Sequence, residues 1–411
     1  MGAFSVPLSG LAASSDWLNV ISNNLANLNT DGYKDETLNF GDLFNQMQGL
    51  SGNGDPIQIG TGVTVSGETS NFADGTVSQT GVASNMALQG NGFFVVQNSN
   101  GQLDYTRDGD FSVNSQGQLC TADGQLVMGY PAASGQVSTS SPLGAINVNE
   151  ASTSPAQATT SFSIDANLDA TSAAGATFSS PITVYDSLGN SHQLTVNYTN
   201  TGTNAWSYTV SIPSADVGGT GTSTTVATGT MSFNSSGQLT SPTSPVALNI
   251  TGLADGAANM SLNWNLTGPD GTTITQQASA SATTTTNQNG YGVGTLTGYT
   301  VTSDGTVEGE FSNNQTIALG QVAVANFANQ QGLTQVGNGN YQATSASGAA
   351  IVGQAGVGGN GTIAGGAVEE SNVSLATEFS NMIVAQQSYD ANAKALTTMD
   401  QVTQATIQLV S

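Results

Sequence analysis

Both ends of the chain carry apolar residues at the spacing of a heptad repeat, and more than 300 residues separate the two ends. The apolar positions are Phe4, Leu8, Leu11, Leu18, Ile21, Leu25 and Leu28 near the start, and Leu375, Phe379, Met382, Tyr389, Leu396 and Met399 near the end. This periodicity predicts one amphipathic helix in residues 1–30 and another in residues 370–411. At about 1.5 Å per residue, the second helix would be a rod of roughly 60 Å.

The two apolar seams can pair with each other or with neighbouring copies of the chain. A two-helix coiled coil would close one domain, but a two-helix hairpin alone leaves much apolar area exposed, and neighbours in an assembly would complete its burial. The two interpretations are compatible, and both remain open. We therefore assign to polymerisation Leu11, Leu18, Ile21, Leu25, Leu28, Leu375, Phe379, Met382, Tyr389, Leu396 and Met399.

The sequence between the helices favours strands and turns. Short apolar runs bounded by Gly, Asp and Asn occur at residues 92–96 and 125–130, and Asp304-Gly305 separates two further runs as a tight hairpin turn would. A second group of alternating strands, in residues 182–185, 193–198 and 206–210, indicates a separate β domain, because hairpin-rich sequence continues on both sides of it.

We therefore expect a mainly β fold with terminal α-helices, in which the helices pair and nested β domains follow, the outermost inserted into the inner one. The expected parts are a helical polymerisation domain (1–30 plus 370–411), connecting segments (31–75 plus 350–369), an inner β domain (76–150 plus 285–349) and an inserted outer β domain (151–284).

Charge excludes several functions. The chain has 3 Lys+Arg against 27 Asp+Glu, a formal net charge of −24, and its basic residues are Lys34, Arg107 and Lys394. Binding nucleic acid requires several basic side chains on one face, so nucleic acid is excluded as a partner, and an anionic membrane surface is disfavoured. No run of 18 apolar residues occurs, so no membrane insertion is expected.

Metal and cofactor chemistry has little support. One histidine and one cysteine cannot form a zinc site of the usual nitrogen and sulfur type. Asp108, Asp110 and Asn114 hint at a calcium loop, but Val113 occupies the position of the turn glycine and Leu119 that of the final glutamate.

The glycine-rich run at residues 356–361 has the dinucleotide-binding spacing, but more glycine follows it instead of a helix, so it is interpreted as a flexible connection. Nothing isolates a pair of carboxylates for glycoside cleavage. We expect no catalytic, cofactor-binding or metal-binding residue, and no enzyme activity.

Three remaining residues receive structural interpretations. His192 lies in a turn-rich stretch and is expected to be an exposed turn residue, whereas Cys120 is expected to be a small core residue. Arg107 is expected to form a local ion pair with Asp104, Asp108 or Asp110. The first 30 residues contain no Lys or Arg, so the positively charged region of a cleaved secretory signal is missing, and a solitary cysteine rules out an internal disulfide. The protein is therefore either cytosolic or exported by a route that reads no cleaved signal peptide, and its low charge and abundant Ser, Thr, Asn and Gly favour export.

Several motifs resemble those of bacterial flagellar axial proteins, the family of rod, hook and hook-associated proteins. At the N-terminal end these are Leu11-Ala-Ala-Ser-Ser-Asp-Trp-Leu-Asn-Val-Ile-Ser-Asn-Asn-Leu-Ala-Asn27 and Thr30-Asp-Gly-Tyr-Lys34. At the C-terminal end they are Ser371-Asn-Val373, residues 383–389, 391–394 and Met399-Asp400. Gly90-Asn-Gly-Phe-Phe94 and Thr106-Arg-Asp-Gly-Asp-Phe111 are similar to the β core of the rod and hook members.

The resemblance implies a homopolymer whose terminal helices line a tube around an export channel while β domains form the outer layers. The inserted zone at 151–284 and the run 298–333 are similar to the hook members, which implies a curved, flexible tube that transmits torque as a universal joint. It further implies, as partners, the distal rod protein, the hook-filament junction protein, the hook cap and the flagellar export apparatus, and an extracellular place in the flagellum.

Two other functions remain open from the sequence. One is a distal rod or hook-associated protein of the same family, and the other is a secreted adhesive or glycan-active β protein. Residues 151–284 contain no Lys or Arg, so the inserted domain is expected to present an acidic, polar surface suited to contacts that slide.

Overall fold

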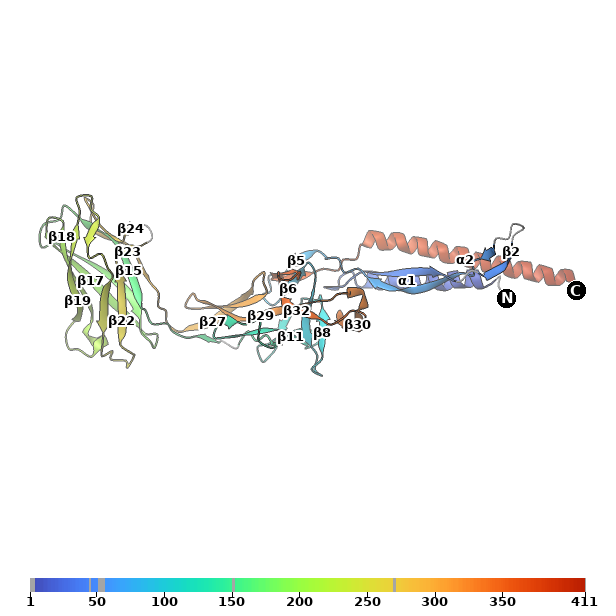
Figure 1. The fold of residues 1–411 in the computed structure, drawn as a ribbon, viewed down its shortest axis with the longest axis horizontal. Helices are drawn as coiled ribbons and strands as arrows, with labels where there is room; N and C mark the ends of the chain where they lie inside the picture. The colour runs from blue at the N-terminus through green and yellow to red at the C-terminus, as the bar shows by residue number, and fades with distance from the viewer. Residues whose placement is uncertain (1–3, 44–45, 51–55, 150–151, 269–270, 411) are drawn as a thin grey trace. The chain divides into compact units, whose positions relative to one another are not determined.

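A computed structural model describes residues 4–43, 46–50, 56–149, 152–268 and 271–410. The chain forms two compact units (Figure 1). The terminal unit comprises Met1–Glu150, Gly298–Gly309 and Ile317–Ser411, and the inserted unit comprises Ala151–Thr297 and Glu310–Thr316. The terminal unit is thus built from segments on both sides of the inserted one.

Two antiparallel helices dominate one part of the terminal unit (Figure 1). Helix α1 spans Ser5–Ala26 and helix α2 spans Leu375–Val410. Asn24 of α1 hydrogen-bonds to Glu378 of α2, whereas Gly10 lies against Asn392, so the chain directions are opposite. With 36 residues against 22, α2 is about 20 Å longer than α1 at 1.5 Å per residue.

A β-hairpin also packs on α1. It pairs β1 (Glu36–Asp42) with β4 (Val63–Ser70), and Trp17 of α1 meets Phe40 of β1 edge to face, with 5.9 Å between ring centroids. A second hairpin pairs β2 (Gln46–Leu50) with β3 (Pro56–Ile59). The stretch that precedes the inner strands therefore contributes regular structure beside the helices.

The rest of the terminal unit is a β body. Its strands are β5 (Val77–Gln79), β6 (Met86–Gln89), β7 (Phe93–Gln97), β8 (Leu103–Thr106), β9 (Ser112–Val113), β10 (Leu119–Cys120), β11 (Leu126–Ala133), β12 (Gln136–Val137), β13 (Gly144–Ala145), β29 (Thr316–Asn326), β30 (Thr334–Gly337), β31 (Asn340–Gln342), β32 (Ile351–Gln354), β33 (Thr362–Gly365) and β34 (Ala367–Glu369). The main sheet runs in the order β29–β11–β7–β8–β31–β30 around an aromatic core that includes Phe93, Tyr105 and Phe327. Strands β33 and β34 pair with β6 and β5, so residues just before α2 return to the start of the body.

The inserted unit is a β-sandwich of two five-stranded sheets, β16–β17–β18–β19–β20 and β21–β22–β15–β25 with β26 also on β15. Its elements are β14 (Thr153–Ser154), β15 (Ser161–Asp169), β16 (Thr177–Tyr185), β17 (Ser191–Gly202), β18 (Ala205–Pro213), η1 (Ser214–Val217), β19 (Ser223–Phe233), β20 (Leu239–Ser241), β21 (Val246–Ile250), β22 (Met260–Asn265), β23 (Thr267–Gly268), β24 (Gly271–Thr272), β25 (Ile274–Gln277) and β26 (Ala282–Gln288). Alternate residues of β17 face inward, as expected for a strand with one buried face. Both sheets contribute to one core, in which Trp264 stacks on Phe162 and meets Tyr208 edge to face.

Strands β27 (Gly294–Val301) and β28 (Thr306–Phe311) contribute residues to both units, and the predicted Asp304-Gly305 turn joins them. Gly305 has a φ of 83°, a conformation that glycine adopts without strain. The expected fold class, mainly β with terminal helices, is confirmed. The finer division into four parts stays a prediction. Within the part of the chain that the structure describes, no helix is long and apolar enough to cross a lipid bilayer.

Candidate functional site

The predicted polymerisation residues divide by exposure. Ile21 is buried in the described structure, and most of the others are partly covered: Leu11, Leu18, Leu25, Leu28, Met382, Leu396 and Met399. Leu375, Phe379 and Tyr389 are exposed, with Phe379 at 50%. The C-terminal seam therefore does not lie wholly against α1.

Among the described residues of α2, the buried positions are polar or small, whereas the large apolar Met382, Leu396 and Met399 are partly covered. Glu378 and Ala385 are buried, and Asn392 lies so close to Gly10 that a methyl group there would be 2.7 Å from the Asn392 Nδ2. Small side chains allow the two helices to approach closely. A pattern of apolar residues does not mark Glu378, Ala385 and Asn392. Their recurrence at seven-residue spacing was the available signal.

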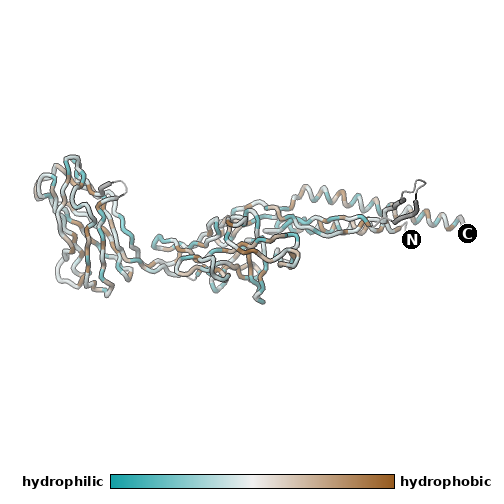
Figure 2. The backbone as a smooth tube through the Cα atoms, in the orientation of Figure 1, coloured by the Kyte–Doolittle hydropathy of each residue, from teal (hydrophilic) through white to brown (hydrophobic). Residues whose placement is uncertain are grey.

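Large apolar side chains consequently remain on the outside of the helices. On α2 they are Leu375, Phe379, Ile383, Val384, Tyr389, Val402 and Ile407, and on α1 they are Val6 and Leu8. Figure 2 shows apolar and polar stretches alternating along α2. Fully burying one Leu, Ile or Phe side chain is worth about 1.5–3 kcal/mol, so this surface favours association with another apolar surface.

Hydrogen bonds from the Asn24 side chain link the end of α1 to Asp35 and Glu36. Its side chain donates to Asp35 Oδ1 and to the Glu36 carbonyl, both at 2.8 Å, and it is buried although the sequence places it on a polar helix face. Asn372, just before α2, accepts from the Asp35 N–H at 2.7 Å and donates to the Asn71 and Ala73 carbonyls. Two asparagines of the terminal motifs thus position the helices on the β strands.

A buried ionic cluster lies at the base of the helices. Lys34 Nζ is 2.6 Å from Glu369 Oε1, and Arg107 Nη1 is 3.3 Å from Glu369 Oε2. All three side chains are almost completely buried. Lys34 also donates to the Ala73 carbonyl, and Arg107 is 3.5 Å from Asp74. Burial lowers the pKa of Lys34 in spite of the opposing effect of Glu369.

The expected local ion pair of Arg107 is therefore wrong. Its guanidinium reaches Glu369, 262 positions away, and donates to the Leu88 and Gly90 carbonyls. The carboxylates next to it in sequence are held elsewhere, since Asp104 accepts from Asn98 and Gln342. Sequence proximity could not identify a partner that only the fold brings close.

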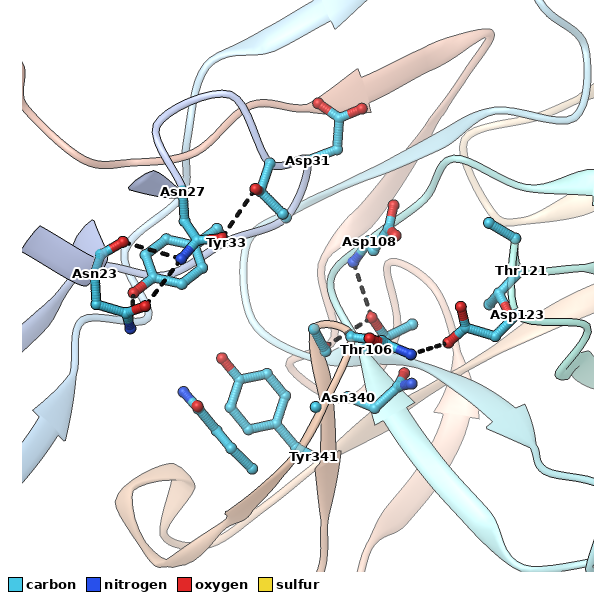
Figure 3. A pocket seen from close by; sticks show the side chains of 17 residues that line it. Asn23, Asn27, Asp31, Tyr33, Thr106, Asp108, Thr121, Asp123, Asn340 and Tyr341 are labelled. Carbon is cyan, nitrogen blue, oxygen red and sulfur yellow. Dashed lines mark hydrogen bonds between the residues drawn. The ribbon is translucent and has the colours of Figure 1, made fainter. Parts of the chain in front are cut away.

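A polar cavity of about 510 Å³ lies between the end of α1 and the β body (Figure 3). Asn23, Asn27, Tyr33, Asp108 and Asn340 are among the residues that line it. Burial and the nearby carboxylates, opposed by a hydrogen bond from a backbone N–H, raise the pKa of Asp108 to about 6. No histidine, lysine or cysteine is among the described residues that line the cavity.

The glycine-rich run at 356–361 forms a turn between β32 and β33, in which Gly356 donates to the Gly361 carbonyl. A strand follows it, so the helix that a dinucleotide site requires is missing at this point. Cys120 is buried in the β body, as expected for a small core residue.

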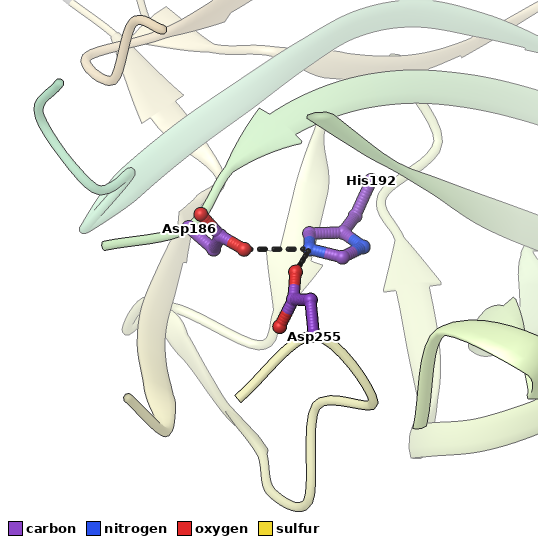
Figure 4. A group of neighbouring side chains, drawn as sticks. All are labelled: Asp186, His192 and Asp255. Atoms are coloured by element: carbon purple, nitrogen blue, oxygen red, sulfur yellow. Dashed lines mark hydrogen bonds and ion pairs between the residues drawn. The ribbon is translucent and has the colours of Figure 1, made fainter. Parts of the chain in front are cut away.

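His192 is buried in the inserted unit, with 6% of its surface exposed, so the expectation of an exposed turn residue is wrong. Its Nδ1 lies 3.0 Å from Asp216 Oδ2. Its Nε2 lies 3.2 Å from Asp186 Oδ2 and 3.6 Å from Asp255 Oδ2 (Figure 4). Three segments of the inserted unit, which carry Asp186, Asp216 and Asp255, pack around the ring. Among the described residues, Asp186, His192 and Asp255 form the one group whose spacing suits a metal ion.

This chain is similar to known proteins along almost its whole length. Family models match residues 5–34 ("Flagella basal body rod protein"), 87–167 ("Flagellar hook protein FlgE/F/G D1 domain"), 147–291 ("Flagellar basal body protein FlaE D2 domain") and 364–409 ("Flagellar basal body rod FlgEFG protein C-terminal"). The flagellar hook protein FlgE of Escherichia coli is 36% identical over 99% of this chain and 100% of that protein.

The chain belongs to the flagellar hook protein family.

The FlgE of Rhizobium meliloti is 31% identical over 99% of this chain and 98% of its own. The crystal structure of Helicobacter pylori flagellar hook protein FlgE2 covers 70% of this chain and 98% of its own with a TM-score of 0.50, and at 13% identity it supports the fold alone. Hook proteins are a structural family, and the described helices expose large apolar side chains that another subunit could cover.

Proposed function

We propose that the chain is the structural subunit of a flagellar hook and assembles with copies of itself through its terminal helices. The exposed apolar residues of α2 carry this proposal, because their burial requires another apolar surface. Copies of the same helices are the partner of matching chemistry in a homopolymer. Full-length similarity to hook proteins, which includes the inserted unit, supports the hook over the rod.

The inserted unit supports the second part of the proposal, a tube that bends as a universal joint. Its core is complete, and it contains no Lys or Arg, so contacts between copies of this unit involve acidic and polar groups. Such contacts are weak and are screened by salt, so they can shift without a large change in free energy. The helices then hold the tube together while the inserted units slide.

The proposed partners at the two ends of the tube are the distal rod protein and the hook-filament junction protein, with the hook cap present during assembly. We propose that the export apparatus delivers the chain unfolded and without a cleaved signal peptide. A chain whose only cysteine is buried when folded needs no disulfide chemistry outside the cell.

Electron microscopy and sedimentation of concentrated protein test the assembly. The full chain should form tubes, and a chain that lacks residues 372–411 should remain monomeric because the exposed apolar side chains of α2 are gone. A chain that lacks residues 151–284 is the matched control, and it should still form an inner tube. Persistent monomers of the full chain, or unchanged tubes after removal of 372–411, would contradict the proposal.

A further inference from the structure

His192 is the basic side chain of the inserted unit. The sequence has no Lys or Arg and no second histidine between residues 151 and 297 or between 310 and 316, so this ring is the one side chain there that can become a cation near neutral pH. The ring is buried at the start of β17, where its neighbours decide its charge.

The hydrogen-bond partners of the two ring nitrogens determine where the protons of the ring lie. Ionised carboxylates only accept hydrogen bonds, and both ring nitrogens face carboxylate oxygens at 3.0–3.2 Å. Each nitrogen must therefore carry a hydrogen, which makes the ring an imidazolium. A neutral ring would leave one nitrogen lone pair directed at a carboxylate in a buried place, which is unfavourable.

The acids around the ring come from three loops. Asp186 follows β16, Asp216 lies in η1, and Asp255 lies between β21 and β22. Asp186 is fully buried and also accepts from the backbone N–H groups of Leu188 and Asn190. These three are the charged groups that contact His192 within the described residues, and Asn190 adds neutral donors to Asp186 and Asp255.

The loops belong to different sheets of the sandwich. The segments with Asp186 and Asp216 extend from the β16–β20 sheet, whereas Asp255 belongs to the loop between two strands of the other sheet. Two further hydrogen bonds cross the same gap, from Ala254 N to the Asp216 carbonyl and from Ala258 N to Ser187 Oγ. Both hydrogen bonds of the ring go to acids on the β16–β20 sheet, and the cation reaches the other sheet through the 3.6 Å contact between its Nε2 and Asp255 Oδ2.

We propose that His192 is a charged clamp that holds the two sheets of the inserted unit together, and that loss of its proton on raising the pH releases this end of the sandwich. The inference goes beyond the assembly function and does not depend on it. It gives the hook an outer unit whose local stability follows the pH of its surroundings.

The direction of the pH effect follows from the pKa of His192. Burial alone lowers this pKa, but the hydrogen bonds and charges of Asp216 and Asp186 outweigh burial and raise it above its ordinary value of 6.5. The stabilisation is therefore fully present below pH 6.5 and is lost as the pH rises through the higher pKa of the folded state. Burial raises the pKa of Asp186, but the hydrogen bonds with Asp255, His192 and the backbone outweigh it and lower that pKa to about 2.

NMR of the imidazole nitrogens in the full chain tests the proposal directly, because a single histidine gives signals that need no assignment. We expect both nitrogens to be protonated at pH 7 and the titration midpoint to lie above 6.5. Asp216→Asn should lower the pKa by about one unit, a tenfold change in proton affinity. Asp165→Asn, on β15 of the same unit, should leave the pKa unchanged.

Unfolding supplies the second readout. In a Trp17→Phe background, Trp206 and Trp264 alone report on the inserted unit. The unfolding midpoint of this unit should decrease as the pH rises above 6.5, and this decrease should be smaller in Asp216→Asn. A neutral ring at pH 7, or a midpoint of unfolding independent of pH, would overturn the clamp.

The same donors can hold a divalent cation, and that outcome also overturns the proposal. Zinc should not shift the imidazole signals of the purified chain, and EDTA should not change its unfolding midpoint. Zinc-dependent signals that Asp255→Asn abolishes would replace the proton with a metal.

Discussion

The helix pair and the β-sandwich bury their apolar residues in different ways. The sandwich encloses both of its large aromatic anchors, Trp206 and Trp264, between two sheets and needs no partner to do so. The helix pair leaves Phe379 and Ile383 about half exposed, because the contact between α1 and α2 uses small residues. The contrast shows that one chain can separate a self-sufficient domain from a surface that only an assembly completes.

Glu369→Gln should produce the largest effect, confined to the terminal unit. The substitution leaves Lys34 and Arg107 buried without their shared carboxylate, which costs about 3–5 kcal/mol of unfolding free energy. Chemical denaturation followed by far-UV circular dichroism measures the loss, while Trp206 and Trp264 fluorescence in a Trp17→Phe background should show the sandwich unchanged. Glu370→Gln, its exposed neighbour, is the control. A comparable loss in the sandwich would mean that the two regions do not fold independently.

The double substitution Phe379→Ser and Ile383→Ser should weaken assembly without unfolding the monomer. Losing the burial of two apolar side chains corresponds to about 3 kcal/mol, or roughly a hundredfold rise in the critical concentration for polymerisation. Sedimentation measures that concentration. Leu188→Ser, at an exposed apolar site of the sandwich, should leave it unchanged. Equal effects at both sites would remove the distinction between the two regions.

Gly10→Ala should destabilise the helix pair by about 1–3 kcal/mol, since the added methyl group collides with Asn392. Thermal unfolding at low concentration, where the chain is monomeric, checks the expected loss. Asn392→Ala in the same chain should restore most of it by making room. If the single substitution is neutral, the close approach of the helices is not what determines their pairing.

The smallest expected effect is that of pH on the terminal unit. The raised pKa of Asp108, about 6, means that the folded state disfavours the charged carboxylate, so stability should increase as the pH falls from 7 to 5. Asp108→Asn should add on the order of 1 kcal/mol at pH 7 and flatten this slope. The stability of the sandwich should also increase as the pH falls, but through His192. Asp108→Asn should therefore change the pH dependence of the terminal unit, and Asp216→Asn that of the sandwich.

Much of the fold could be predicted from local pattern. Heptad spacing located both helices, alternation located strands such as β17, and Asp304-Gly305 located a turn. Periodicity does not reveal which face of a helix another element will cover, so the inward side of α2, with Ala385 and Glu378, was not found.

The polar clusters could not be predicted because their members are far apart in sequence. Arg107 meets Glu369 only after the β body has formed, and His192 meets Asp255 only when two sheets have packed together. A histidine in a Gly-Asn-Ser turn gives no sign of burial by itself. The deciding observation is the complete set of groups around it, which requires the fold.

In the proposed delivery of the unfolded chain by an export apparatus, the contact between Lys34 and Glu369 determines which part of the chain folds last. The two residues are 335 positions apart. Whichever end leads, the buried charge cluster can close only after nearly the whole polypeptide has come out, while the sandwich, encoded between them, can already be complete. The ionic cluster is thus a late step in maturation, and the helices become fixed in their final place only when the chain can no longer slip back.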